Sequence, residues 1–107
     1  MTKPWRLHPA AEREVRQAAR WYEQRREGLG FDFLAEVGRA RSGLEALPSH
    51  GALVPGLPAS LGVRRALLRR FPYEVIYVEL SAHYEVIAVG HQRRQPGYWL
   101  GRLDAGG

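Results

Sequence analysis

The chain has 107 residues, no cysteine and a formal net charge of +5, with a sequence pI near 10.2. A chain of this length predicts one domain, spanning residues 1–107, with a core of its own. The absence of cysteine excludes disulfide bonds, thiolate chemistry and zinc sites built on cysteine. No stretch is apolar enough to cross a membrane and no signal peptide is visible, so we expect a cytoplasmic protein, whose basic charge favours an acidic protein segment or nucleic acid as partner.

A strand and a first helix are predicted at the start of the chain. Residues 4–8 alternate between apolar and polar side chains, which is typical of a strand. Pro9 suits the first turn of a helix that runs to about Arg26. Its apolar residues recur at the three- and four-residue spacing of one helix face: Ala11, Val15, Ala18 and Tyr22. We interpret Trp21 and Tyr22, both in this helix, as core residues rather than binding residues.

A second helix follows the turn Gly28-Leu29-Gly30 and forms a hairpin with the first. Asp32 suits its N-terminal turn because its charge opposes the helix dipole, and Pro48 stops the helix. Gly38 and Gly43 lower the helix propensity of its middle. They indicate either close packing against a neighbouring element or variation on an exposed face.

Three β-favouring runs in the second half predict an antiparallel meander: residues 63–70, 73–80 and 84–89. The links between them are short enough to force neighbouring strands together. The last two runs are apolar on both faces, which favours the centre of a sheet. In the third run, the two faces alternate as Val86 and Ala88 against Ile87 and Val89. The first run carries arginines on both faces, so we expect it near an edge or along a groove.

Two segments are expected to lack fixed structure. Residues 49–62 form a long connection with several prolines and glycines, and we expect it to be mobile. The tail from about residue 103 ends in two glycines and is expected to fray. The predicted fold is therefore α+β, with an N-terminal strand and a helical hairpin packed on one face of an antiparallel sheet of about four strands.

Arginines dominate the candidate binding residues. Arg64, Arg65, Arg69 and Arg70 belong to the first meander run, and Arg93, Arg94, Tyr98 and Trp99 follow the last one. Guanidinium groups pair with phosphate or carboxylate, so we interpret the first four as a surface for phosphate or an acidic partner. The alternative is an edge strand whose charges prevent association between sheets. Tyr98 and Trp99 either cap the open end of the core or contact a base or a partner side chain.

Histidine gives a weaker signal for chemistry. His91 ends a buried run, and we interpret it as a hydrogen-bonded structural residue rather than a general base. His8, His50 and His83 lack the spacing of metal ligands. The sequence therefore predicts no metal site and no cofactor.

Four segments carry motifs that are weak one by one and specific in their order and spacing. They are residues 18–23 (Ala-Ala-Arg-Trp-Tyr-Glu), residues 29–37 (Leu-Gly-Phe-Asp-Phe-Leu-Ala-Glu-Val), residues 65–77 with an Arg-Arg-Phe-Pro-Tyr centre, and residues 88–99, which end Arg-Arg-Gln-Pro-Gly-Tyr-Trp. Together they cover most of the chain, which resembles the RelE/ParE superfamily of type II toxin-antitoxin toxins. The resemblance implies a small α+β toxin that a cognate antitoxin neutralises by wrapping it, so a toxin-antitoxin hetero-oligomer is possible.

The resemblance leaves two targets open, because RelE-like members cut mRNA on the ribosome and ParE-like members inhibit DNA gyrase. In the ribonuclease branch, arginines stand where this chain has Glu74 and, by the best alignment, Gln92. His91, Arg93 and Tyr98 are the alternative catalytic candidates, since they could supply a base, a cation and an acid for RNA cleavage. The set is incomplete by the family pattern, so the resemblance favours a ParE-like toxin that acts by binding, with ribosome-dependent RNA cleavage as the alternative.

Overall fold

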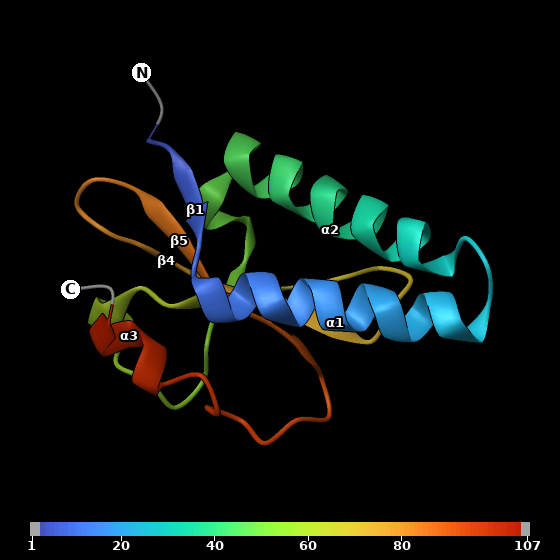
Figure 1. Ribbon diagram of the computed structural model, residues 1–107. Coiled ribbons are helices and arrows are strands. Elements are labelled where there is room, and N and C mark those ends of the chain that lie inside the picture. The colour runs from blue at the N-terminus through green and yellow to red at the C-terminus, as the bar shows by residue number, and fades with distance from the viewer. Residues whose placement is uncertain (1–2, 106–107) are drawn as a thin grey trace.

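The computed structural model describes residues 3–105, which form a five-stranded sheet with a helical hairpin on one face (Figure 1). The elements are β1 (Trp5–Leu7), α1 (Pro9–Arg25), α2 (Leu29–Ala46), β2 (Ala52–Leu53), β3 (Arg64–Leu67), β4 (Tyr73–Glu79), β5 (Tyr84–His91) and α3 (Gly101–Ala105). Two short 3₁₀ turns, Pro48–His50 and Ala59–Leu61, flank β2. The predicted α+β class is confirmed. Helix α3 occupies part of the tail that we expected to fray, and residues 106–107 lie outside the described residues.

The strand order is β1-β5-β4-β3-β2, which places β4 and β5 inside the sheet as predicted. Every neighbouring pair is antiparallel except β1, which runs parallel to β5. The sheet has one strand more than the four we expected, because Ala52 and Leu53 of the long connection pair with β3. Strand β3 lies second from the edge and ends at Leu67, so Arg69 and Arg70 belong to the turn before β4 rather than to a strand.

The connection before β3 is more ordered than we expected. Besides β2, it holds both 3₁₀ turns. The Tyr77 hydroxyl donates to the carbonyl oxygen of Pro48 at 2.5 Å and accepts from the N–H of Gly51 at 2.9 Å. Arg64 donates to the carbonyl oxygen of Gly51 at 2.7 Å. This segment contains several isolated prolines and glycines, and it folds because side chains of the meander satisfy its backbone groups.

The sheet carries a hydrophobic core on each face. On the face covered by α1 and α2, the core includes Phe33 and Leu44 together with Val75, Tyr77, Val86 and Val89 from the sheet. On the opposite face, Trp99 and the partly buried Leu103 pack with Val63, Ile76, Val78, Ile87 and Ala88. Because both faces are covered, β4 and β5 are apolar on both sides.

A β-bulge changes which residues of β5 share a face. Ile76 is opposite Ala88 and Tyr77 is opposite Val86, so Ile87 is the extra residue of the bulge. Val86 and Val89 consequently face the hairpin, whereas Ile87 and Ala88 face the other core. The strict alternation predicted for this run is therefore wrong, since one inserted residue reverses the side on which the following residues lie.

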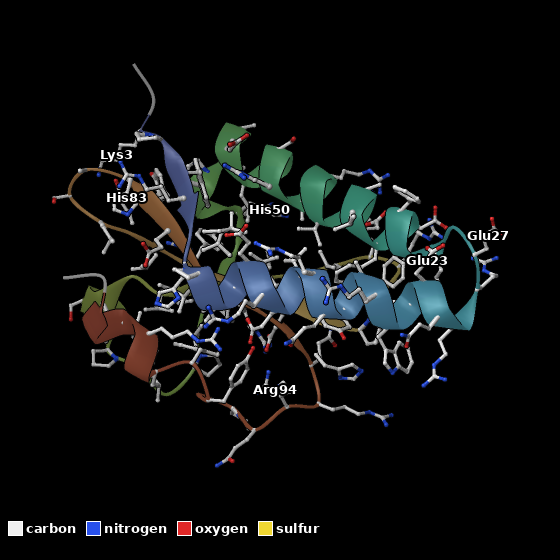
Figure 2. The ribbon with its side chains drawn as sticks, viewed as in Figure 1. Lys3, Glu23, Glu27, His50, His83 and Arg94 are labelled. Carbon is white, nitrogen blue, oxygen red and sulfur yellow. The ribbon has the colours of Figure 1, made fainter. Side chains whose placement is uncertain are left out.

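The hairpin turn is fixed by one carboxylate. Glu23 accepts hydrogen bonds from the N–H groups of Gly28 and Gly30, both at 2.9 Å, at the hairpin tip (Figure 2). Gly28 adopts a φ of 88°, which favours glycine. Helix α2 begins at Leu29, so Asp32 lies in its first turn as predicted, and the carboxylate of Glu23 satisfies two amide groups at the start of the helix.

Two interpretations of the hairpin residues are wrong. A β-carbon at Gly38 or Gly43 would meet nothing within 4 Å, so neither glycine marks close packing, and the exposed-face alternative holds. Trp21 is 49% exposed and has the guanidinium of Arg25 over its ring at 4.2 Å. Tyr22 does pack inward, with its ring centroid 4.8 Å from that of Phe71. Helical periodicity gives the side of the helix but not the point at which the sheet beneath it ends.

Candidate binding site

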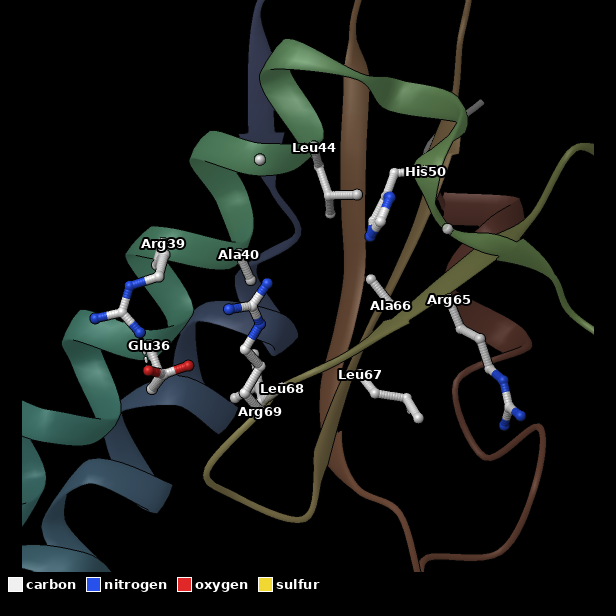
Figure 3. Close-up of a pocket in the computed structure, with 12 residues that line it drawn as sticks. Glu36, Arg39, Ala40, Leu44, His50, Arg65, Ala66, Leu67, Leu68 and Arg69 are labelled. Atoms are coloured by element: carbon white, nitrogen blue, oxygen red, sulfur yellow. Dashed lines mark hydrogen bonds and ion pairs between the residues drawn. The ribbon is translucent and has the colours of Figure 1, made fainter.

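A groove of about 360 Å³ runs between α2 and β3 at the edge of the sheet, and we call it the α2–β3 groove (Figure 3). Its apolar lining comes from both walls: Ala40 and Leu44 of α2, and Ala66, Leu67 and Leu68 in and after β3. Its charged lining consists of Glu36, Arg39, Arg65 and Arg69. Apolar and charged side chains are thus combined in one open hollow, as in sites that bind amphipathic segments.

The charges of this groove are unevenly paired. The carboxylate of Glu36 is buried, with a side chain 4% exposed, and forms an ion pair with the exposed Arg39. Arg65 lies 3.5 Å from the carboxylate of Glu74. Arg69 has no ion-pair partner among residues 3–105, and Figure 3 shows its side chain between the two walls. Figure 3 shows the guanidinium of Arg65 pointing away from α2, on the face of the second core where Glu74 lies. Within the groove, Arg39 and Arg69 therefore face the single carboxylate of Glu36, which leaves the groove cationic.

Two other predicted binding arginines hold the structure around the groove. Arg64 is engaged by the carbonyl oxygen of Gly51 in the connection before β3. Arg70 lies 3.6 Å from the carboxylate of Asp32 at the start of α2. Of the four arginines that we assigned to one surface, Arg65 and Arg69 line the groove, and Arg64 and Arg70 brace segments beside it.

A second group of charges gathers where the C-terminal segment meets α1, and we call Glu14, Arg94, Tyr98 and Arg102 the Glu14 cluster. The carboxylate of Glu14 accepts from the two terminal nitrogens of Arg102 at 2.9 and 3.0 Å and from the Tyr98 hydroxyl at 2.8 Å. It also accepts from Arg94 at 3.3 Å and from the backbone N–H of Val89 at 2.9 Å. One carboxylate therefore joins α1, β5 and the C-terminal segment.

The environment of Tyr98 makes its hydroxyl a weaker acid than an ordinary tyrosine. Burial, followed by the hydrogen bond and negative charge of Glu14, raises the pKa of Tyr98 well above its usual range. The guanidinium of Arg94 lies over the Tyr98 ring at 3.7 Å. Trp99, the next residue, is buried in the second core. Three of the four binding candidates that follow β5 therefore have contacts within the molecule.

A cleft of about 300 Å³ lies between the C-terminal segment and the strands β3 and β4, and we call it the β4 cleft. Its polar lining includes Arg65, Glu74, Gln92, Gln95 and Tyr98. The amide nitrogen of Gln92 donates to the carbonyl oxygen of Tyr73 at 3.3 Å. The charge of Arg65 is opposed by Glu74, so this cleft is less cationic than the α2–β3 groove.

The alternative catalytic candidates are not gathered in one hollow. Tyr98 lines the β4 cleft, whereas His91 lines a separate groove of about 520 Å³ beside α1, and Arg93 lines neither. Nδ1 of His91 accepts from the backbone N–H of Arg93 at 3.0 Å, and its ring lies against Tyr73 with centroids 5.3 Å apart. His91 is thus hydrogen-bonded and packed, in agreement with the structural interpretation.

Two kinds of feature are absent from residues 3–105. These residues contain no group of three or more histidine or acidic side chains that could hold a metal ion. They also contain no helix long and apolar enough to span a membrane.

A comparison with protein families decides the relationship that the motifs suggest. The family model described as ParE toxin of type II toxin-antitoxin system, parDE, matches residues 5–96. The match begins in β1 and includes the hairpin, both central strands and Arg93 and Arg94. The chain belongs to the ParE toxin family. The predicted resemblance to the ParE-like branch of the superfamily is confirmed.

Structural comparison agrees with this family. This ParE-family toxin matches a solved chain described as "Chromosomal ParDE TA system from P. aeruginosa" with a TM-score of 0.71. The two chains are 14% identical, and the match covers 84% of this chain and 96% of the other. At this identity the likeness establishes the shared fold. No curated protein sequence matches the chain significantly.

The sequence reasoning missed several charged residues of the α2–β3 groove and of the Glu14 cluster: Glu14, Glu36, Arg39 and Arg102. A usable signal existed for two of them. Glu14 lies three residues after Ala11 and Glu36 three residues after Phe33, so each carboxylate falls within the apolar stripe of its helix. A carboxylate on a buried stripe requires a partner, and here each one has an arginine.

Proposed function

We propose that this ParE-family toxin acts by binding its target, and that the target is DNA gyrase rather than ribosome-bound mRNA. The observation that carries the proposal is the composition of the β4 cleft. Glu74 and Gln92 line it where the ribonuclease branch of the superfamily has arginines. A carboxylate facing the scissile phosphate would repel it and would oppose the negative charge that develops in the transition state.

The remaining groups of the cleft support the same conclusion. Two cations line the cleft, Arg65 and Arg94. The charge of Arg65 is opposed by Glu74 at 3.5 Å, and that of Arg94 by Glu14 at 3.3 Å. Tyr98 has a raised pKa and its hydroxyl donates to Glu14, so it holds its proton against transfer to a leaving oxygen. Loss of one electrostatic contact typically costs about 10²–10³-fold in rate, so loss of two leaves little cleavage.

Two assays with purified toxin test this function. We expect inhibition of gyrase supercoiling, and no codon-specific cuts when primer extension is carried out on mRNA bound to translating ribosomes. The control is the same toxin after mixing with its antitoxin, which should restore supercoiling. Codon-specific cuts would overturn the proposal, and His91, Arg93 and Tyr98 would then be the first residues to replace.

The proposed function includes an antitoxin, and the α2–β3 groove is the surface best suited to it. The groove is cationic and partly apolar, with Arg69 unpaired among residues 3–105. An acidic amphipathic segment would neutralise its charge and cover its apolar wall, Leu44, Leu67 and Leu68. Complementary charge also speeds association, which suits an inhibitor that must capture a toxin rapidly.

Charge reversal tests this surface. We expect Arg69→Glu to weaken the complex with the cognate antitoxin by about tenfold or more, since an attraction becomes a repulsion. Arg16→Glu is the control, because Arg16 lies on the exposed side of α1 and pairs with Glu12 of the same helix. Calorimetry measures the affinity of each variant for the antitoxin. An equal loss of affinity in both variants would contradict the assignment of the groove as the binding surface.

A further inference from the structure

The groove of about 520 Å³ beside α1 differs in composition from the α2–β3 groove, and we call it the α1 groove. Its lining comes from α1, from β5 and from the start of β4, and it includes Trp21, Tyr22, Tyr73, His91 and Arg94. The described residues that line the α2–β3 groove include no tryptophan, tyrosine or phenylalanine, and the two linings share no residue. Tryptophan, tyrosine and arginine supply most of the binding energy at protein interfaces. The α1 groove therefore has the composition of an interface centre.

The aromatic rings of this groove are held in position by contacts within the toxin. Trp21 is 49% exposed, but the guanidinium of Arg25 lies over its ring and Tyr22 meets it edge to face, with centroids 5.1 Å apart. On the sheet, the ring of His91 lies against Tyr73, with centroids 5.3 Å apart. Rings that are already fixed lose little conformational entropy when a partner binds. The exposed face of Trp21 is therefore prepared for contact.

The charge at the margin of the α1 groove is positive. Glu14 is the one acidic side chain among the described residues of its lining, and its oxygens already accept from Arg102, Tyr98 and the N–H of Val89. Arg94 approaches the same carboxylate at 3.3 Å, the longest of these contacts, and its side chain is 51% exposed. Two guanidinium groups thus share one negative charge. The surplus positive charge attracts a carboxylate of a partner.

The lining distinguishes between a protein segment and a nucleic-acid strand as occupant. A strand of nucleic acid stacks its bases on aromatic rings and needs a row of cations along its phosphates. Arg94 is the one arginine or lysine among the described residues that line the α1 groove, whereas Ala18, Pro72 and Val89 add apolar surface. A protein segment with an apolar side chain and one neighbouring carboxylate matches this lining better.

We propose that the toxin binds its target through the α1 groove, where an apolar or aromatic side chain of the target protein packs on Trp21 and Tyr73 and a neighbouring carboxylate faces Arg94. The inference rests on the proposed gyrase target and adds the surface that contacts it. Target and antitoxin then occupy different hollows. A stable interface buries roughly 800 Å² on each partner, more than one hollow presents, and both hollows border the same helical hairpin. An antitoxin in the α2–β3 groove therefore excludes the target by its bulk.

Truncation of the exposed tryptophan tests the surface. We expect Trp21→Ala to raise the toxin concentration that half-inhibits gyrase supercoiling by about tenfold or more, because it removes the centre of the contact. Phe31→Ala is the matched control, since Phe31 is an aromatic residue of the hairpin that is 75% exposed and lies outside the lining. It should inhibit within about twofold of the wild type. Calorimetry with the cognate antitoxin, which should bind both variants with unchanged affinity, shows that they fold.

A pair of charge substitutions tests the acidic character of the target segment. Gln17 is exposed on α1 and lines the same groove, so neither substitution disturbs the core. Gln17→Glu should raise the half-inhibiting concentration by about threefold or more, whereas Gln17→Lys should leave it unchanged or lower it. An equal effect of the two substitutions would overturn the inference. The pair also decides the matter if Trp21→Ala does not fold.

The outcomes separate the surface from the function. Inhibition by the wild type together with equal inhibition by Trp21→Ala overturns the α1 groove and leaves gyrase as the target. Absence of inhibition by the wild-type toxin overturns both proposals. A folded Trp21→Ala variant that loses antitoxin affinity along with inhibition would assign the groove to the antitoxin and would also overturn the inference. Loss of inhibition by Trp21→Ala alone, with antitoxin binding retained, supports it.

Discussion

The Glu14 cluster and the α2–β3 groove both gather arginines beside the sheet, but they differ in how these charges are matched. In the cluster, Arg94 and Arg102 share one carboxylate that also holds a phenol and a backbone amide. In the groove, Arg69 has no ion-pair partner among residues 3–105. The same residue type therefore stabilises the fold in one region and is available for binding in the other.

The largest expected effect comes from removing the centre of the cluster. Glu14→Ala leaves the partly buried Arg102, the Tyr98 hydroxyl and the Val89 amide without their acceptor. We expect a loss of about 3 kcal/mol in the free energy of unfolding, measured by urea denaturation. Glu12→Ala is the matched control, because Glu12 forms an exposed pair with Arg16 on the same helix; it should cost less than about 0.5 kcal/mol. An equal loss of unfolding free energy in the two variants would show that Glu14 stabilises the fold no more than an exposed ion pair does.

Two glycines, one beside the Glu14 cluster and one in the α2–β3 groove, differ in the space that surrounds them. A β-carbon at Gly90 would overlap the Tyr98 hydroxyl, so Gly90→Ala should lower the free energy of unfolding by about 1–3 kcal/mol. Gly43, which lines the α2–β3 groove, has open space around it, and Gly43→Ala should raise that free energy by about 0.5–1 kcal/mol. Thermal melting curves measure both. A gain at Gly90 would contradict the close contact with Tyr98.

Alkaline pH should weaken the Glu14 cluster. Because burial and Glu14 raise the pKa of Tyr98 in the folded state above the usual value of 10.0, the unfolded chain loses this proton first as the pH rises. The contribution is complete below pH 10 and declines above it, by up to about 1.4 kcal/mol per pH unit for one proton. Tyr98→Phe should therefore show a shallower decline when unfolding is measured across this range. An unchanged slope would exclude Tyr98 as its source.

The smallest expected effect separates two arginines near the groove. Arg64→Ala should cost about 1 kcal/mol, because it leaves the carbonyl oxygen of Gly51 without its donor. Arg69→Ala should change the free energy of unfolding by less than about 0.5 kcal/mol, since Arg69 has no ion-pair partner among residues 3–105. Chemical denaturation of both variants makes the comparison. A large loss at Arg69 would mean that its charge already stabilises the fold.

The sequence by itself determined the elements and the family. Apolar residues at helical spacing gave α1 and α2, and β-favouring runs gave β3, β4 and β5, because side-chain periodicity is a local property of each element. The motifs of the hairpin and of the meander identified a ParE-like toxin before any contact was known, and the family match over residues 5–96 confirms it. Arg65 and Arg69 line the α2–β3 groove, and their part in binding stays a prediction.

Only the tertiary structure decided how the charges are matched. Glu14 meets Tyr98 and Arg102 across 84 and 88 positions of the chain, and no local pattern specifies such a pair. The bulge at Ile87 and the short strand β2 likewise depend on register between strands, which packing of the whole sheet selects. An arginine has the same local pattern whether it is paired or free. Its role is set by the carboxylates that the fold brings within reach, and for this reason the sequence located the basic residues but not the ones left open for a partner.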